Sequence, residues 1–159
     1  MRINDLGDYG FRVSNPGGEW LAEKRENSLR GRDPTLIGHE ARLTAFFEQP
    51  MYLPAEFVHG IPGARKEQRQ PGEPQFDRLL PKIQKHGFNF DFRNAVLVGV
   101  NQLGDAYVIE GNTRAAVAVH EGIPLIPVEV RYFNGGEAIG GPYHPRNIIA
   151  LARQNHQDQ

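Results

Sequence analysis

The chain contains no cysteine, and its charges are balanced instead of being of one sign. The missing cysteines exclude disulfide bonds, thiolate metal sites, iron–sulfur clusters and cysteine nucleophiles. Eighteen Lys and Arg residues against nineteen Asp and Glu residues leave a formal net charge of −1, so no global positive field attracts a polyanion. Any polyanion site is therefore expected to be local.

Long hydrophobic runs are also missing. No stretch approaches the roughly 18 apolar residues of a membrane span, and the N-terminus lacks the apolar core of a signal peptide. The six histidines are scattered without the spacing of metal ligands, so a zinc site is not expected. We expect a cytoplasmic protein without membrane contact.

The length of 159 residues fits one domain with a small appendage. Eighteen glycines and twelve prolines are typical of a chain rich in loops, and 39% apolar residues are enough to form a hydrophobic core. The spacing of apolar residues predicts helices over 19–29 and from Asp33 or Thr35 to Glu48. We expect three segments: a helical or irregular N-terminal extension (1–48), a main domain (49–138) and a C-terminal tail with a short helix at 147–153 (139–159).

The main domain is expected to alternate short strands and helices. Apolar periodicity predicts a helix that ends before Gly87, although Pro81 implies that it starts only near Leu79 or is kinked. Continuous β-branched runs predict a hairpin. The expected elements are strands at 51–53, 95–100, 106–109 and 128–133, and a small-residue helix at 114–121.

The turn Glu110-Gly111-Asn112-Thr113-Arg114 lies between an expected strand and an expected helix. A glycine there lets the backbone approach a ligand, and the first amides of the helix favour an anion. The guanidinium of Arg114 matches phosphate oxygens. The alternative is a structural role, in which Arg114 pairs with Glu110 or Glu121.

The order of these parts resembles the ParB/sulfiredoxin superfamily over about residues 50–133. The resemblance is sharpest in the run Tyr107 to Ala116, with its Gly-x-x-Arg turn, and in Gly122-Ile123-Pro124. It implies an α+β fold, a small ParB/sulfiredoxin-like mixed sheet with packed short helices. It also implies that Gly111, Asn112, Thr113 and Arg114 bind nucleotide phosphates, and the stand-alone domain fits a phage or mobile-element protein.

Departures from the family restrict the reaction. Asn112 stands where sulfiredoxin has its reacting cysteine, which excludes sulfinic acid reduction by that route. Partition proteins have Gly-Glu-Arg-Arg at the turn and continue into a helix-turn-helix domain, for which this chain has no room after Phe133. Free-serine kinases have Asp-Gly-His-His-Arg; Glu110 stands for the acidic residue, but Asn112 and Thr113 replace both histidines.

A second charged strip, Arg65-Lys66-Glu67-Gln68-Arg69, lies in the long loop after the first expected strand of the main domain. In relatives this loop meets the Gly-x-x-Arg turn, so the resemblance implies that Glu67 and Arg69 reach the triphosphate. A carboxylate beside phosphates requires Mg²⁺, which would bridge Glu67 or Glu110 to ATP or CTP. Glu67 would then orient or deprotonate the acceptor, with Glu110 as the second catalytic carboxylate. The alternative is a solvated loop.

Three functions remain open at this point. The first is nucleotide binding with Mg²⁺-dependent phosphoryl transfer or triphosphate hydrolysis, as in an NTPase or a small-molecule kinase. The second is a non-catalytic interaction module with a decayed nucleotide site, whose residues 1–48 dock to a protein or nucleic-acid partner. The third is a nuclease that acts on single-stranded nucleic acid through Arg65, Lys66 and Arg69.

Overall fold

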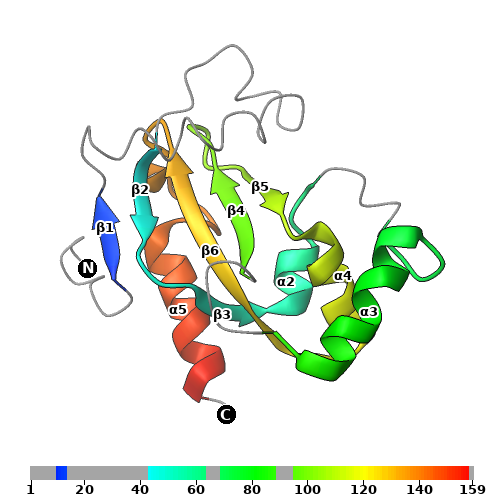
Figure 1. Cartoon of the computed structure of the whole chain (residues 1–159). Coiled ribbons are helices and arrows are strands. Elements are labelled where there is room, and N and C mark those ends of the chain that lie inside the picture. Colours follow the sequence, from blue (N-terminus) through cyan, green and yellow to red (C-terminus); the bar gives the residue numbers. More distant parts are fainter. Residues whose placement is uncertain (1–9, 14–42, 64–68, 89–94, 158–159) are drawn as a thin grey trace.

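The described residues form a six-stranded mixed sheet with helices packed around it (Figure 1). The computed structural model describes residues 10–13, 43–63, 69–88 and 95–157. The α+β class expected from the sequence is confirmed. The elements are β1 (Phe11–Val13), β2 (Leu43–Phe47), β3 (Met51–Pro54), α2 (Ala55–His59), α3 (Pro74–His86), β4 (Val96–Val100), β5 (Ala106–Glu110), α4 (Asn112–His120), β6 (Leu125–Phe133), the short 3-10 helix η4 (Gly136–Ala138) and α5 (Pro145–Gln157).

Strand β6 is the centre of the sheet, because three other strands pair with it. Its first half pairs antiparallel with β3, and its second half pairs antiparallel with β2. Strand β4 runs parallel to β6 and pairs antiparallel with β5, which follows it through a tight turn. Strand β1 extends the sheet beyond β2.

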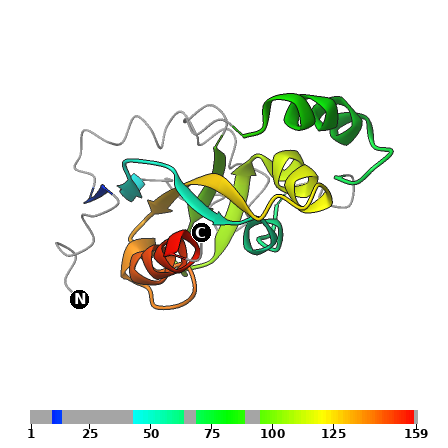
Figure 2. The same cartoon turned by 90° about the horizontal axis from the view of Figure 1, so that it is seen from below.

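The main core lies on the face of the sheet that α2 and α5 cover (Figure 2). Successive side chains of a strand point to opposite faces, so every second residue of β6 faces this core. These residues are Ile126, Val128, Val130 and Tyr132, and α5 adds Ile148, Ile149 and Ala152. The tail helix is therefore an integral part of the core.

The opposite face of the sheet combines apolar and charged side chains. A small buried cluster there consists of Leu43, Leu97, Ile109 and Phe133. Glu129 is only 4% exposed, and Arg131 Nη2 donates a hydrogen bond to its carboxylate. Arg131 Nη1 also donates to the Phe47 carbonyl at 3.1 Å, and its guanidinium lies 4.7 Å from the Phe46 ring centroid. Both charged groups are thus compensated within the fold.

The helix expected from Asp33 or Thr35 to Glu48 is wrong over Leu43–Phe47, which form β2. Burial alternates along this segment with the period of a strand, because β2 pairs with β6. The Thr44 hydroxyl fixes the pairing further, since it donates to Glu137 Oε1 at 2.6 Å and accepts from the Gly135 amide at 3.0 Å. The expected helix over 19–29 and the first part of the second expected helix, up to residue 42, lie outside the described part.

The other expected elements are present with changed ends. The strand at 51–53, the hairpin and the helix before Gly87 are confirmed. Helix α3 runs from Pro74 through Pro81, so a start near Leu79 is wrong. Strand β6 and helix α5 begin earlier than expected, at Leu125 and Pro145. Among the described residues no helix has the length and hydropathy needed to cross a membrane.

Candidate functional site

The turn between β5 and α4 is built around Gly111, which has a left-handed backbone with φ 103°. Glycine adopts this conformation without the steric penalty that a Cβ imposes. The neighbouring strand adds a second constraint, because a Cβ on Gly111 would lie 3.0 Å from Val96 Cγ2. The glycine expected from the sequence at this turn is therefore required by backbone and packing together.

No side chain of the described residues caps the N-terminus of α4. The Ala115 amide donates to the Gly111 carbonyl at 2.9 Å, so the amides of Asn112 and Thr113 precede this first helical hydrogen bond. Helix α5 differs, because its Arg146 amide donates to His144 Nδ1 at 3.1 Å. Of these two helix starts, the one at α4 therefore offers amides suited to an anion.

Arg114 lies in the first turn of α4 and is half-buried. Burial lowers the pKa of its guanidinium, and the carboxylate of Glu110 partly opposes this shift. Glu110 is exposed at the end of β5. The structure thus brings these two predicted site residues into electrostatic contact, with a guanidinium that stays charged because an arginine pKa lies far above neutral pH.

The side chain of Asn112 points into the protein, and the residue is 7% exposed. Its Nδ2 lies 3.5 Å from the Val108 carbonyl, and its Oδ1 has no hydrogen-bond partner among the described residues. Gly63 packs directly on this amide, since a Cβ on Gly63 would lie 2.1 Å from Asn112 Oδ1. A ligand at the turn would therefore meet the backbone amide of Asn112 and not its side chain.

The loop after α2 is attached beside this turn. The Val108 amide donates to the Pro62 carbonyl at 2.8 Å, and Gly63 forms a parallel bridge with Val108. Gly63 was not among the expected site residues, because Pro-Gly in a loop predicts a turn and does not indicate which distant residue packs against it. The chain thus enters the charged loop next to the start of α4.

Of the expected loop residues, Arg69 lies in the described part, whereas Arg65, Lys66 and Glu67 lie outside it. Arg69 is half-buried, and its Nε is buried and has no hydrogen-bond partner in the segments that the structure describes. Within the described segments no group of three or more His, Asp or Glu side chains could hold a metal ion. The described carboxylate at the turn is Glu110.

In comparisons with known proteins, no family model, no curated protein and no solved structure matches the chain.

Proposed function

We propose that the protein binds a nucleoside triphosphate at the turn between β5 and α4 and uses it in Mg²⁺-dependent phosphoryl transfer or hydrolysis. The observation that carries the proposal is the left-handed Gly111 followed by an uncapped helix start, because free amides at a helix N-terminus favour phosphate oxygens. The half-buried guanidinium of Arg114 lies in the same turn. Partial burial strengthens its attraction for an anion.

These positions support the roles proposed for the turn and for Arg69, whereas the role of Glu67, which lies outside the described residues, rests on the family resemblance alone. The amides of Asn112 and Thr113 hold one phosphate, and Arg114 holds a second. Arg69, whose Nε has no partner in the described part, supplies another charge. Glu110 would hold Mg²⁺ together with the phosphates, and Glu67 would be the second carboxylate, because Mg²⁺ in such sites takes one or two carboxylates and the substrate's own oxygens. Glu67 orients or deprotonates the acceptor.

A second candidate function is a non-catalytic interaction module. It is supported by the contacts that two residues of the turn make within the protein itself. The side chain of Asn112 is buried against Gly63, and Arg114 is in electrostatic contact with Glu110. Such internal contacts could serve the fold alone. The two candidates differ in one measurable property, the affinity for nucleotides.

The test is a calorimetric titration with ATP, CTP and GTP in the presence of Mg²⁺. We expect one nucleotide to bind the wild type and Arg114→Gln to weaken it about tenfold or more, the value of a charged hydrogen bond. Arg146→Gln is the matched control, because Arg146 also lies in the first turn of a helix, but one whose start is capped by His144. If no nucleotide binds the wild type, the interaction module is favoured.

The reaction is tested separately by product analysis. Glu67→Gln and Glu110→Gln are expected to lose turnover while they keep most of the affinity for nucleotide measured without Mg²⁺. Inorganic phosphate as product indicates hydrolysis, and a phosphorylated acceptor indicates transfer. Turnover that survives in both variants would contradict the proposed carboxylate roles.

A further inference from the structure

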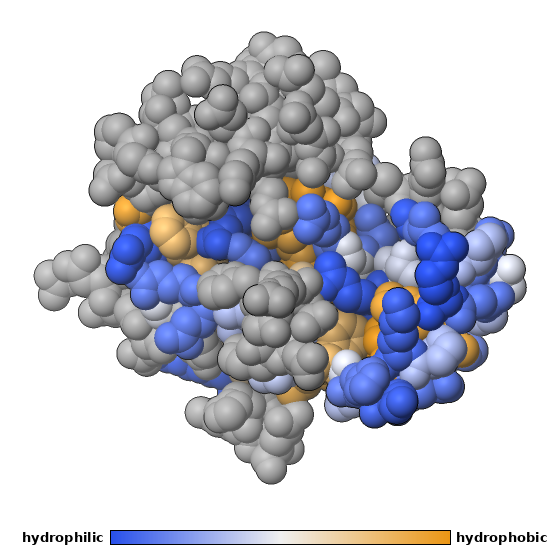
Figure 3. All heavy atoms as spheres, viewed as in Figure 1, coloured by the Kyte–Doolittle hydropathy of each residue, from blue (hydrophilic) through white to orange (hydrophobic). Residues whose placement is uncertain are grey.

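Helix α3 has an apolar inner face and a basic outer face. Phe76 and Ile83 are buried and pack with Ala116 and Val117 of α4. The outer face carries three exposed basic residues, Arg78, Lys82 and Lys85. Their spacing of four and three residues places them in one row along the helix. In Figure 3 the surface on the side of α3 is largely hydrophilic. We call this row the α3 basic face.

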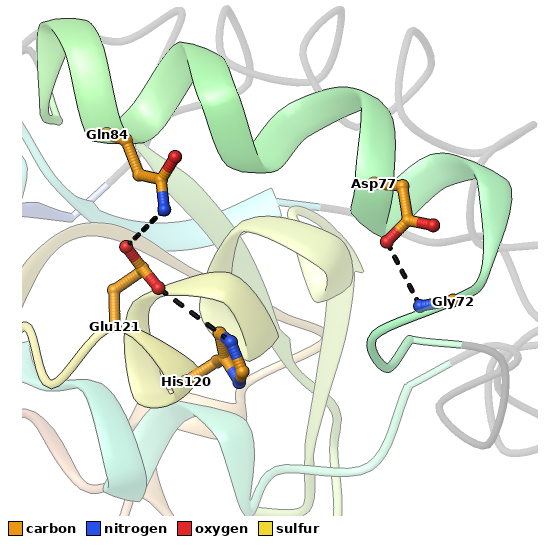
Figure 4. A network of polar contacts seen from close by, with 5 residues as sticks. All are labelled: Gly72, Asp77, Gln84, His120 and Glu121. Carbon is orange, nitrogen blue, oxygen red and sulfur yellow. Dashed lines mark hydrogen bonds and ion pairs between the residues drawn. The ribbon is translucent and has the colours of Figure 1, made fainter.

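No carboxylate within the described part of the chain compensates this row. Within α3, no Asp or Glu lies three or four positions away from Arg78, Lys82 or Lys85. The three positive charges of the row therefore repel one another without a neighbouring carboxylate on the helix. Two nearby carboxylates are engaged elsewhere (Figure 4). Asp77 accepts the Gly72 amide at 3.0 Å, and Glu121 accepts from Gln84 at 2.9 Å and lies 3.8 Å from His120 Nε2.

The helix dipole does not account for the row. Cations are favourable only in the last turn of a helix, which here contains Lys85 and His86. Arg78 lies outside the last turn, so the dipole does not stabilise its charge. The repulsion between Arg78 and Lys82 is thus a cost to the free protein that a bound polyanion would remove.

The chemistry of the face favours nucleic acid over a protein partner. The exposed large hydrophobic residues of the described part are Val13, Tyr52, Leu103 and Ile139, and none of them lies on α3. Protein interfaces centre on such apolar and aromatic side chains, whereas a phosphodiester backbone needs only regularly spaced cations. Arg78 and Lys85 are seven positions apart, so the α3 basic face is roughly 10 Å long. This length corresponds to two or three successive phosphates of one nucleic-acid strand.

We propose that the α3 basic face binds the phosphodiester backbone of nucleic acid without sequence preference. The site is separate from the proposed nucleotide site, and neither depends on the other. The contact is purely ionic, so its affinity falls steeply with salt.

The test measures fluorescence anisotropy with a labelled single strand of roughly 30 nucleotides and its duplex at about 50 mM salt and above. Lys82→Gln/Lys85→Gln is expected to weaken binding about tenfold and to reduce the slope of log K against log salt by about 0.7 per charge on single strands and 0.9 on duplex. Arg146→Gln/Arg153→Gln on α5 removes the same charge from a helix far from α3 (Figure 2) and should leave the affinity nearly unchanged.

Three results would overturn the proposal. The first is that the wild type does not bind either oligonucleotide at low salt. The second is that the two double variants lose affinity equally, which would mean that only net charge matters. The third is that polyglutamate of equal charge competes as well as the oligonucleotide, which would make the partner an acidic protein. Circular dichroism checks that each variant is folded.

Discussion

At the scale of single residues, Gly111 shows how backbone and packing combine at one position. Its φ of 103° disfavours any side chain, and a Cβ would lie 3.0 Å from Val96 Cγ2, closer than an ordinary van der Waals contact. We expect Gly111→Ala to lower the free energy of unfolding by about 1–3 kcal/mol. The measurement is urea denaturation followed by circular dichroism.

The matched control for this prediction is Gly122→Ala. Gly122 also has a positive φ of 70°, but a Cβ there would meet no atom within 4 Å. The control should therefore show the backbone penalty without the contact with Val96. Equal losses in the two variants would mean that the packing against Val96 is relieved at no cost.

The sequence predicted the residues of the turn better than their orientation. Glu110, Gly111 and Arg114 could be assigned to a strand-to-helix turn because a β-branched run, a glycine and a helix-forming run follow one another. The inward side chain of Asn112 could not be predicted, since it depends on Gly63 from a distant loop. A long-range contact of this kind leaves no local pattern.

At the scale of elements, β6 carries a buried ion pair on an otherwise partly apolar face. Glu129 and Arg131 lie two residues apart on one side of the strand, and both are largely buried. Removal of one member of a buried pair leaves the other uncompensated. We expect Glu129→Leu alone to cost about 3–5 kcal/mol of unfolding free energy.

The double variant Glu129→Leu/Arg131→Leu tests the reason for this loss. Replacement of both charges by apolar side chains of similar size is often neutral or stabilising. We expect the double variant to recover much of the stability in chemical denaturation. If it is as unstable as Glu129→Leu, then the contacts of Arg131 with Phe46 and Phe47 matter more than the pair.

The start of α5 contains a group whose protonation should change stability. Burial lowers the pKa of His144 from its usual 6.5, and Arg146 lowers it further. The neutral ring is the form that accepts the Arg146 amide at Nδ1. Because the unfolded chain binds the proton more tightly, this stabilisation is present above pH 6.5 and is lost as the pH falls through the lower folded pKa.

We therefore expect His144→Asn to reduce the fall in Tm between about pH 7 and pH 5, since Asn caps a helix without titrating. Differential scanning calorimetry over this range gives the measurement. An unchanged slope in His144→Asn would show that the cap does not couple to pH.

Elements with a strong local pattern could be predicted, and those that depend on pairing could not. The β-branched runs of β4 and β5 have one plausible conformation, whereas Leu43–Phe47 fits a helix or a strand by local composition. Its register with β6 decides the outcome. The same applies to the early start of β6, whose first residues pair with β3.

At the scale of the whole molecule, the sheet order predicts where the fold is most protected. Val128 and Val130 of β6 are buried between paired strands, whereas β1 lies at the edge of the described sheet and pairs there with β2. We expect the amides of β6 to exchange with deuterium only through global unfolding and those of β1 much faster. Hydrogen exchange followed by mass spectrometry distinguishes the two. Early exchange in β6 would mean that the sheet opens locally at its centre.

The central place of β6 also has a consequence during synthesis. Strands β2 and β3 leave the ribosome long before β6, which is their shared partner. Until then the nascent chain carries two apolar strands with unpaired backbone edges, a state prone to aggregation. Slow translation between β3 and β6 would lengthen this exposure, so the yield of native protein in a cell should depend on chaperones that bind extended apolar segments.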